Sequence, residues 1–291
     1  MQLLLNALIA GSFAALLASG LSLVYGVLGI FNMALGQLAL VGGLTTWWLV
    51  SILSLPLPLA IAGGILITAL TTWFGFEFFV APYYRRHRFL PLVTTIAFSM
   101  ILDGLILVIF HQEPKTIDVG TRTLLPVFDA LISSQQIVLI VLTILFLALL
   151  TWVLVKTAFG RRIRATVQHP TAAESLGIRS SLLHRIVFIV SGVLAGFAGI
   201  YVGIDQNLTP TIGFAITIKA YAAIIAGGKD SMKGTILCAY LIALLEQLSI
   251  GLPWFGSYIP SGYQSTVALL VIILVLLIKP QGLFGSKTRI A

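Results

Sequence analysis

Residues 156–185 read KTAFGRRIRATVQHPTAAESLGIRSSLLHR, and this polar stretch determines how we expect the rest of the chain to be arranged. It carries six lysine and arginine residues and a single acid, Glu174, whereas the runs at about 136–155 and 186–202 on either side are apolar. Basic loops between membrane spans accumulate on the cytoplasmic side. We therefore expect this stretch to connect two spans inside the cell.

The middle of this stretch, HPTAAESLG at residues 169–177, predicts a short helix. Pro170 suits a first helical position, Ala172 and Ala173 favour helix propagation, and Gly177 can end the helix. A helix outside the bilayer offers a docking surface to a cytoplasmic partner. The same residues also fit a basic connector that touches only lipid headgroups, and spacing alone leaves both interpretations open.

Composition places the whole chain in a membrane. Of its 291 residues, 59% are hydrophobic and 9% are charged, whereas ordinary globular chains carry about 25% charged residues. The net charge is +8, and the basic residues cluster in short loops. This placement indicates orientation in a membrane rather than nucleic-acid binding. A single cysteine, Cys238, excludes an internal disulfide and a cysteine-based metal cluster. The N-terminal apolar run has no basic region before it and is longer than the apolar region of a signal peptide. We therefore expect it to be retained as the first span.

Runs of roughly 20 apolar residues predict the membrane-spanning helices. They fall at about 3–25, 38–50, 59–80, 90–110, 136–155, 186–202, 235–250 and 265–278, with a shorter segment at about 215–226. The expected fold class is all-α: one transmembrane domain over residues 1–291, a helical bundle of about eight or nine segments with broken helices. If the short segment crosses, the N-terminus lies outside and the C-terminus inside; if it is re-entrant, one of these assignments changes.

Two glycine-interrupted regions, 26–37 and 203–228, lie in the two halves of the chain. Paired broken helices of this kind indicate a midplane pathway in transporters, and tight packing in an inert bundle is the alternative. The polar residues of these regions are our candidates to line such a path: Asn32, Gln37, Asn207, Thr209 and Lys219.

Four ionisable residues lie within the predicted spans: Glu77, Asp103, Lys219 and Glu246. Charged groups are costly in a bilayer and therefore indicate either function or pairing. We expect Lys219 to pair with Asp103 or Glu246, and all four residues to hold the bundle together. Direct contact with a substrate is the second interpretation.

Patterns for catalysis and nucleotide binding are missing from the sequence. The four histidines show no metal-ligand spacing, and no Gly-x-Ser-x-Gly elbow occurs. Gly285-Ser286-Lys287-Thr288 lacks the glycine that directly precedes lysine in a P-loop. We therefore expect no enzyme and no cofactor bound by this chain, and any ATP that drives it would be used by partner subunits.

Residues 160–178, GRRIRATVQHPTAAESLGI, closely resemble the cytoplasmic loop of the LivH-type permeases of branched-chain amino acid ABC transporters, which reads like GRAIRAxAQNPEAAxLxGI. His169 and Thr171 depart from the family's Asn and Glu. Three further stretches agree with the family in chain order, at residues 23–43, 209–228 and 279–285. The sequence GGKDS at 227–231 departs from the family's usual GGLGS, a change on the cytoplasmic face that would affect contacts with the ATPase.

This resemblance implies a permease subunit of a bacterial ABC importer in the inner membrane. Its partners would be a second permease (a second copy or a related paralogue), cytoplasmic ABC ATPase subunits and a periplasmic substrate-binding protein. The substrate would be a branched-chain amino acid or a related small polar solute, such as urea or a short amide. The helix at about 170–177 would be the coupling helix, driven by ATPase closure. The residues at the ATPase contact would be Arg164, Gln168, Pro170, Ala172, Ala173, Glu174 and Gly177.

Two functions of other classes stay open on the sequence. A stand-alone secondary transporter or channel would use Lys219 and the buried acids to handle ions, and it would need no ATPase. An integral-membrane enzyme would need a cluster of polar catalytic residues at one interface, which the sequence does not show.

Overall fold

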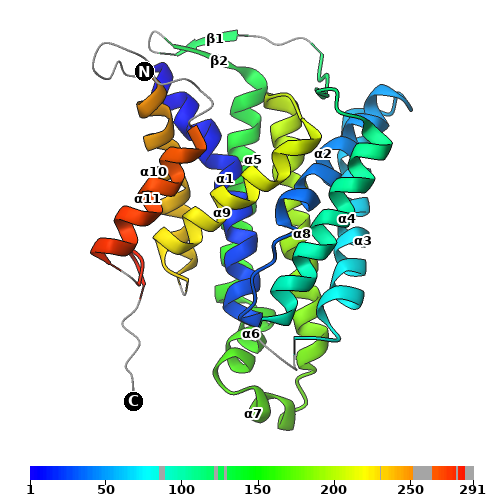
Figure 1. Cartoon of the computed structure of the whole chain (residues 1–291), viewed down its shortest axis with the longest axis vertical. Coiled ribbons are helices and arrows are strands. Elements are labelled where there is room, and N and C mark those ends of the chain that lie inside the picture. Colours follow the sequence, from blue (N-terminus) through cyan, green and yellow to red (C-terminus); the bar gives the residue numbers. More distant parts are fainter. Residues whose placement is uncertain are drawn as a thin grey trace.

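The computed structural model describes residues 1–84, 89–120, 124–127, 130–229, 231–251, 264–279 and 281–285. Within these ranges the chain forms a bundle of long apolar helices (Figure 1). The bundle helices are α1 (Gln2–Leu28), α2 (Leu35–Ser51), α3 (Leu57–Gly75, continued by a π-helical turn at Phe76–Val80), α4 (Leu90–Phe110), α5 (Ser134–Lys156), α8 (Ser180–Asp205), α9 (Gly213–Gly227, preceded by a 3-10 turn at Pro210–Ile212), α10 (Met232–Gly251) and α11 (Gln264–Ile278).

Helix length agrees with the predicted spans. Among the described residues, seven helices are long and apolar enough to cross a membrane, and α2 and the apolar part of α11 are shorter. The sequence thus predicted the polytopic helical bundle correctly. The interruption predicted before the second span is confirmed, because the chain leaves the helix after Leu28 and α2 begins at Leu35.

Small side chains place α1 at the centre of the bundle. In the most apolar window of α1, 94% of residues are buried, compared with 28% for α4 and α5. α1 packs against α5, α8, α9 and α10, while α2 packs against α3, α8 and α9. Small residues let helices approach closely in lipid: a Cβ added at Gly199 of α8 would lie 1.7 Å from the carbonyl oxygen of Ala39 in α2. The helices α3, α4 and α5 turn their large apolar side chains outward instead.

The two ends of the bundle are distinct. We call the end formed by α6 (Ala158–Gln168), α7 (Pro170–Ser175) and the first turn of α8 the basic end, and it lies at the bottom of Figure 1. The opposite end carries the N-terminus and a β-hairpin, and the backbone of Lys115 pairs there with Leu208 at 2.7 and 2.9 Å. Gly251 lies against Leu3 at this end.

The short segment predicted at 215–226 crosses the bundle. The chain leaves the opposite end at Leu208, and α9 carries it to the basic end, where Lys229 lies 5.9 Å from the Tyr25 ring. The backbone of Leu283 and Phe284 then bonds to the end of α9. The N-terminus and the described C-terminal segment therefore lie at opposite ends, as the crossing alternative requires.

Two elements were not predicted from the sequence. Strands β1 (Leu124–Val127) and β2 (Ala130–Ser133) form an antiparallel hairpin in which Leu124 pairs with Ser133. The second is α6, whose first turn is capped by the Thr157 hydroxyl, which accepts from the Gly160 amide. The hairpin was not predicted because a run of four apolar residues does not distinguish a strand from other structure. Helix α6 was not predicted because its many charged residues mask the periodicity of its one apolar face.

Candidate functional site

The short helix in the basic stretch is confirmed as α7. Pro170 occupies its first position, and Gly177 ends it with a φ of +82° that a side chain rarely tolerates. The amide of Ile178 donates to the Ala173 carbonyl at 3.0 Å, and the Gly177 amide donates to the Glu174 carbonyl at 2.9 Å. The sequence of the stretch therefore builds a closed turn of helix at the basic end.

The residues predicted to contact an ATPase divide into two groups. Six of the seven are exposed at the basic end: Arg164, Gln168, Pro170, Ala172, Glu174 and Gly177. Ala173 is 2% exposed, so it lies on the buried face of α7 and packs against the rest of the protein. The surface also carries Leu176, which is 82% exposed and which the sequence analysis did not single out. The presence of a partner there stays a prediction.

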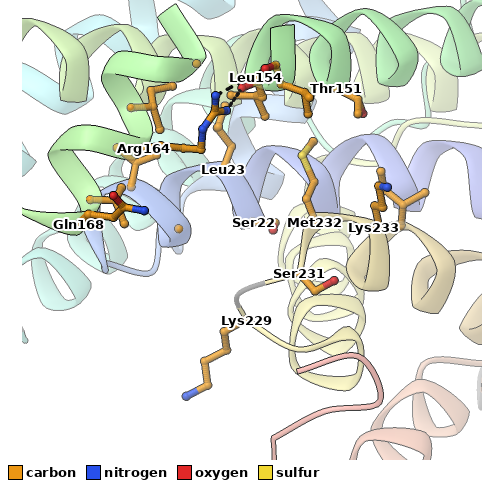
Figure 2. Close-up of a pocket in the computed structure, with 17 residues that line it drawn as sticks. Ser22, Leu23, Thr151, Leu154, Arg164, Gln168, Lys229, Ser231, Met232 and Lys233 are labelled. Atoms are coloured by element: carbon orange, nitrogen blue, oxygen red, sulfur yellow. Dashed lines mark hydrogen bonds between the residues drawn. The ribbon is translucent and has the colours of Figure 1, made fainter. Parts of the chain in front are cut away.

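α6 ties α7 to the end of α5. The Arg164 guanidinium donates to the carbonyl oxygens of Leu154 and Val155 in the last turn of α5 (Figure 2). A cation there complements the negative end of the helix dipole. A Cβ at Gly160 would lie 1.9 Å from the Leu154 carbonyl oxygen, so only glycine lets α6 start this close to α5. The start of α6 is thus held to the end of α5 by a close backbone approach at Gly160 and by the exposed Arg164 guanidinium, which caps α5.

The start of α8 is tied to the end of α3. Arg185 lies 3.0 Å from the Glu77 carboxylate, which sits in the π-helical turn. The rings of Tyr84 and His184 meet edge to face, with centroids 5.3 Å apart. π-helical turns often occur at functional positions in helices. Displacement of α7 would therefore reach both α5 and α3.

The other ionisable residues in the spans also join neighbouring helices. Lys219 of α9 lies 2.9 Å from Glu246 of α10, so the expected pairing is confirmed with Glu246 and not with Asp103. Asp103 of α4 instead accepts from the Gln37 amide of α2 at 3.2 and 3.3 Å. These contacts agree with the expectation that the charged groups hold the bundle together.

The two glycine-interrupted regions meet inside the bundle. The amide of Gly36 donates to the Thr217 hydroxyl at 3.0 Å, and a Cβ at Gly36 would lie 1.9 Å from the Gly213 carbonyl oxygen. The first turns of α2 and α9 therefore abut, and we call this contact the α2–α9 junction (Gly36, Gly213 and Thr217). The pairing of the two broken regions, inferred from their glycines, is present in the fold.

Two predicted path residues lie near this junction with unused polar atoms. Asn32 is fully buried and Gln37 is 1% exposed. The Asn32 oxygen accepts from the Ala34 amide at 3.1 Å, while the Asn32 amide nitrogen and the Gln37 carbonyl oxygen have no hydrogen-bond partner among the described residues. Buried polar atoms without a partner are costly and call for a solute or water. Both side chains can therefore serve a passing polar molecule.

The other three path candidates lie elsewhere. Asn207 is exposed at the opposite end, where it accepts from the Thr116 hydroxyl at 2.6 Å, and Thr209 follows it at the start of the 3-10 turn. Lys219 faces α10 in its ion pair with Glu246, away from the α2–α9 junction. The structure thus places Asn32 just before α2 and Gln37 in its first turn, and it directs Lys219 toward α10 instead.

An aromatic cluster lies between the buried polar residues and the basic end. The rings of Tyr25 and Phe31 stack with centroids 4.5 Å apart, and Phe31 meets Tyr221 at 5.4 Å. Below it, a cavity of about 540 Å³ is lined by Tyr25 and continues to Pro170 of α7. The sequence does not predict this cluster, because its three members come from α1, the non-helical residues 29–34 and α9.

The opposite end carries an exposed ion pair. Lys115 lies 2.9 Å from Glu113 and 4.9 Å from the Trp47 ring. The hydrogen bond from Lys115 lowers the pKa of the Glu113 carboxyl below its usual range. Among its described residues, this end is polar but lacks the cationic excess of the basic end.

Comparison with known proteins gives one consistent family. Residues 3–276 match the model for the permease component of the branched-chain amino acid transport system. The high-affinity branched-chain amino acid transport system permease protein BraD of Pseudomonas aeruginosa is 30% identical over 98% of this chain and 95% of its own. The corresponding protein LivH of Escherichia coli K12 is 26% identical over the same shares.

The fold is also found in a solved structure. A chain of PsaBC from Streptococcus pneumoniae, solved in complex with Fab, superposes with a TM-score of 0.51 at 18% identity, covering 97% of this chain and 93% of that one. At this identity the likeness concerns the arrangement of helices alone.

Proposed function

The chain belongs to the family of permease components of branched-chain amino acid transport systems, and we propose that it forms the membrane path of an ABC importer. The observation that carries this proposal is α7: an exposed helix at the basic end, held to α5 through Arg164 and joined by α8 to α3 through Arg185. Such a helix can receive movement from another protein and pass it to the spans.

The partners follow from this role. We propose that ABC ATPase subunits dock on α7 from the cytoplasm, that a second permease completes the path, and that a periplasmic binding protein delivers the substrate. The second permease would be another copy of this chain or a related one. The complex would lie in the bacterial inner membrane with its basic end inside, because basic loops stay on the cytoplasmic side. ATP would be bound and used by the partner subunits, with no cofactor on this chain.

The substrate path would pass the α2–α9 junction. The free amide nitrogen of Asn32 and carbonyl oxygen of Gln37 offer a donor and an acceptor to a small polar solute. Asn207 and Thr209 would lie nearer the periplasmic entrance, and the cluster of Tyr25, Phe31 and Tyr221 would close the cytoplasmic side. A branched-chain amino acid fits the family, and urea or a short amide would use the same two groups.

Alternating access would start at α7. ATPase closure pushes on α7, and Arg164 and Arg185 transmit the displacement to α5 and α3. Rigid helices that slide as units can convert a small shift at one end into opening at the other. Lys219 and Glu246 would keep α9 and α10 moving together during this step.

The test is a charge placed on the exposed face of α7. Ala172→Arg should abolish co-purification of the ATPase and ATP-dependent uptake in vesicles, because a large cation replaces a small exposed contact. Ala158→Arg is the matched control, since Ala158 is also exposed at the basic end but starts α6. Ala173 is unsuitable, because its substitution would dislodge α7 from within. If uptake persists without ATP and no ATPase is recovered, the chain is a stand-alone carrier and the proposal fails.

A further inference from the structure

A cavity of about 580 Å³ opens at the basic end between α5 and α10. The last turns of α1 form its back wall, α5 and α6 one side, and the α9–α10 turn the other. Figure 2 shows Arg164 on the α6 side and Lys233 on the α10 side, with Ser22 of α1 between them. The cavity shares Gly26, Val27 and Val167 with the cavity that runs from Tyr25 toward α7, but its other walls belong to α5, α6 and α10 rather than to α7 and α8.

The helices on both sides of the cavity expose apolar side chains. Trp152 of α5 is 58% exposed and Leu237 of α10 is 55% exposed. Val155, which is 54% exposed, lines the cavity itself. In a chain that spans a membrane such surfaces meet lipid, and tryptophan favours the level of the headgroups. Acyl chains would thus border the cavity on both sides.

The cavity is cationic as well as apolar. It is lined by Arg164, Lys229 and Lys233, and none of the described residues that line it is acidic. Arg164 already caps α5, while Lys229 and Lys233 are exposed and form no ion pair within the described part of the chain. Figure 2 shows Lys229 reaching outward at the mouth. Asp230, which follows Lys229, lies outside the described residues.

We propose that this cavity binds an anionic phospholipid. The lipid phosphate lies at the mouth, between Lys229 and Lys233, and one acyl chain enters along Val155 and Ile236 against α1. Basic pockets between spans on the cytoplasmic side recognise the head groups of anionic lipids. A soluble acidic segment would satisfy the lysines but leave the apolar walls uncovered, and a neutral lipid would leave the lysines without a counter-charge.

The first test removes the charges at the mouth. Purified transporter complex is incubated with phosphatidylglycerol or with phosphatidylcholine of the same acyl chains, and retained lipid is measured by native mass spectrometry. Wild type should retain phosphatidylglycerol preferentially. Lys229→Gln and Lys233→Gln should each lower retention about fivefold, the effect of one cation at an anionic surface. Lys156→Gln should leave it unchanged, because Lys156 is exposed at the same end but does not line the cavity.

The second test fills the apolar part. Gly26 lines the cavity, and a Cβ added there meets nothing within 4 Å, so Gly26→Leu adds apolar volume at this wall without a clash at its Cβ. Leucine is also a better helix former than glycine. We expect the variant to unfold at the wild-type temperature and to retain phosphatidylglycerol at least tenfold less.

Three results would overturn the proposal. Equal retention of the two lipids by wild type excludes selectivity for charge. Unchanged phosphatidylglycerol in both the lysine variants and Gly26→Leu excludes this cavity as the site. Loss of ATPase or of the second permease from these variants, with lipid retention unchanged, assigns the cavity to a protein partner.

Discussion

Lys219 and Glu246 are the most deeply buried ion pair among the described residues, with side chains 17% and 3% exposed. The geometry is good, but in an apolar surrounding the loss of one partner is far more costly than the pair is favourable. The pair therefore fixes how α9 packs against α10 and adds little to the net stability of the protein.

We predict that Lys219→Met lowers the stability of the protein strongly, by about 3–5 kcal/mol, because the Glu246 carboxylate loses its cation. Thermal unfolding in detergent measures the loss. The double variant Lys219→Met with Glu246→Leu should regain most of this stability, since no unpaired charge is then left between α9 and α10. A double variant less stable than either single variant would contradict this.

Asn32 is the residue whose side chain best separates structure from transport. Its oxygen holds the first turn of α2 through the Ala34 amide, whereas its amide nitrogen is unused among the described contacts. Asn32→Asp keeps the first contact and removes the donor, but it also buries a carboxylate that has no cation beside it, so we expect a lower unfolding temperature. We predict that uptake per folded transporter falls at least tenfold.

The control for this substitution is Asn6→Asp in α1. Asn6 accepts from Gln2 near the opposite end and lies far from the α2–α9 junction. It should leave uptake nearly unchanged. If Asn32→Asp transports normally, Asn32 does not contact the substrate, and the path must be sought elsewhere.

Sequence could identify these residues but not their partners. The sequence offers two acids, Asp103 and Glu246, as partners for Lys219. Spacing along the chain does not show which of the two spans α9 packs against. The pairing with Glu246 needed the packing of α9 against α10. Nothing in the sequence indicates that Tyr25, Phe31 and Tyr221 form a cluster, since aromatic residues are common in apolar spans.

At the scale of elements, the joint between α3 and α8 offers a coupling that can be tested apart from stability. Glu77 and Arg185 are 36% and 39% exposed, so their ion pair contributes at most about 1 kcal/mol. Its position, between the π-helical turn and the first turns of α8, matters more than its strength.

We predict that Glu77→Gln leaves the unfolding temperature nearly unchanged but lowers the solute transported per ATP hydrolysed several-fold. Simultaneous measurement of uptake and phosphate release in vesicles gives this ratio. Glu113→Gln, which breaks the exposed pair with Lys115 at the opposite end, is the matched control and should not change it. If the unfolding temperature falls while the solute transported per ATP stays unchanged, Glu77 has a structural role only.

Elements were predictable where length and end signals were strong. Pro170 and Gly177 located α7 within two residues of its observed end, because both have backbone preferences of their own. α6 was missed, since its buried residues Gly160, Ile163 and Thr166 include one large apolar side chain only. The β1–β2 hairpin was missed because its strands span four residues each.

At the scale of the whole molecule, apolarity alone did not tell the core from the lipid-facing surface. The best window of α1 has a mean hydropathy of 2.0 and that of α5 has 3.1, yet α1 is the buried helix. In lipid the driving force is close packing rather than burial of apolar area. Small residues such as Gly11, Ser12 and Ala15 are therefore the better indicator of the centre.

The fold makes one global prediction about sidedness, because the basic end and the N-terminal end lie at opposite ends of the bundle (Figure 1). The chain has a single cysteine, Cys238, which is 1% exposed, so Cys238→Ser provides a background without thiols. In this background Gln112→Cys places a thiol at the exposed opposite end, and Ser175→Cys places one on exposed α7. A membrane-impermeant maleimide should label the Gln112→Cys variant in intact spheroplasts and the Ser175→Cys variant only in inverted vesicles. The Cys238→Ser parent should stay unlabelled in both. Labelling of both variants from the same side would mean that α5, the long helix between Gln112 and Ser175, does not cross the membrane. The basic end and the opposite end would then not face different compartments, and α7 could not meet an ATPase on one side while a binding protein delivers the substrate on the other.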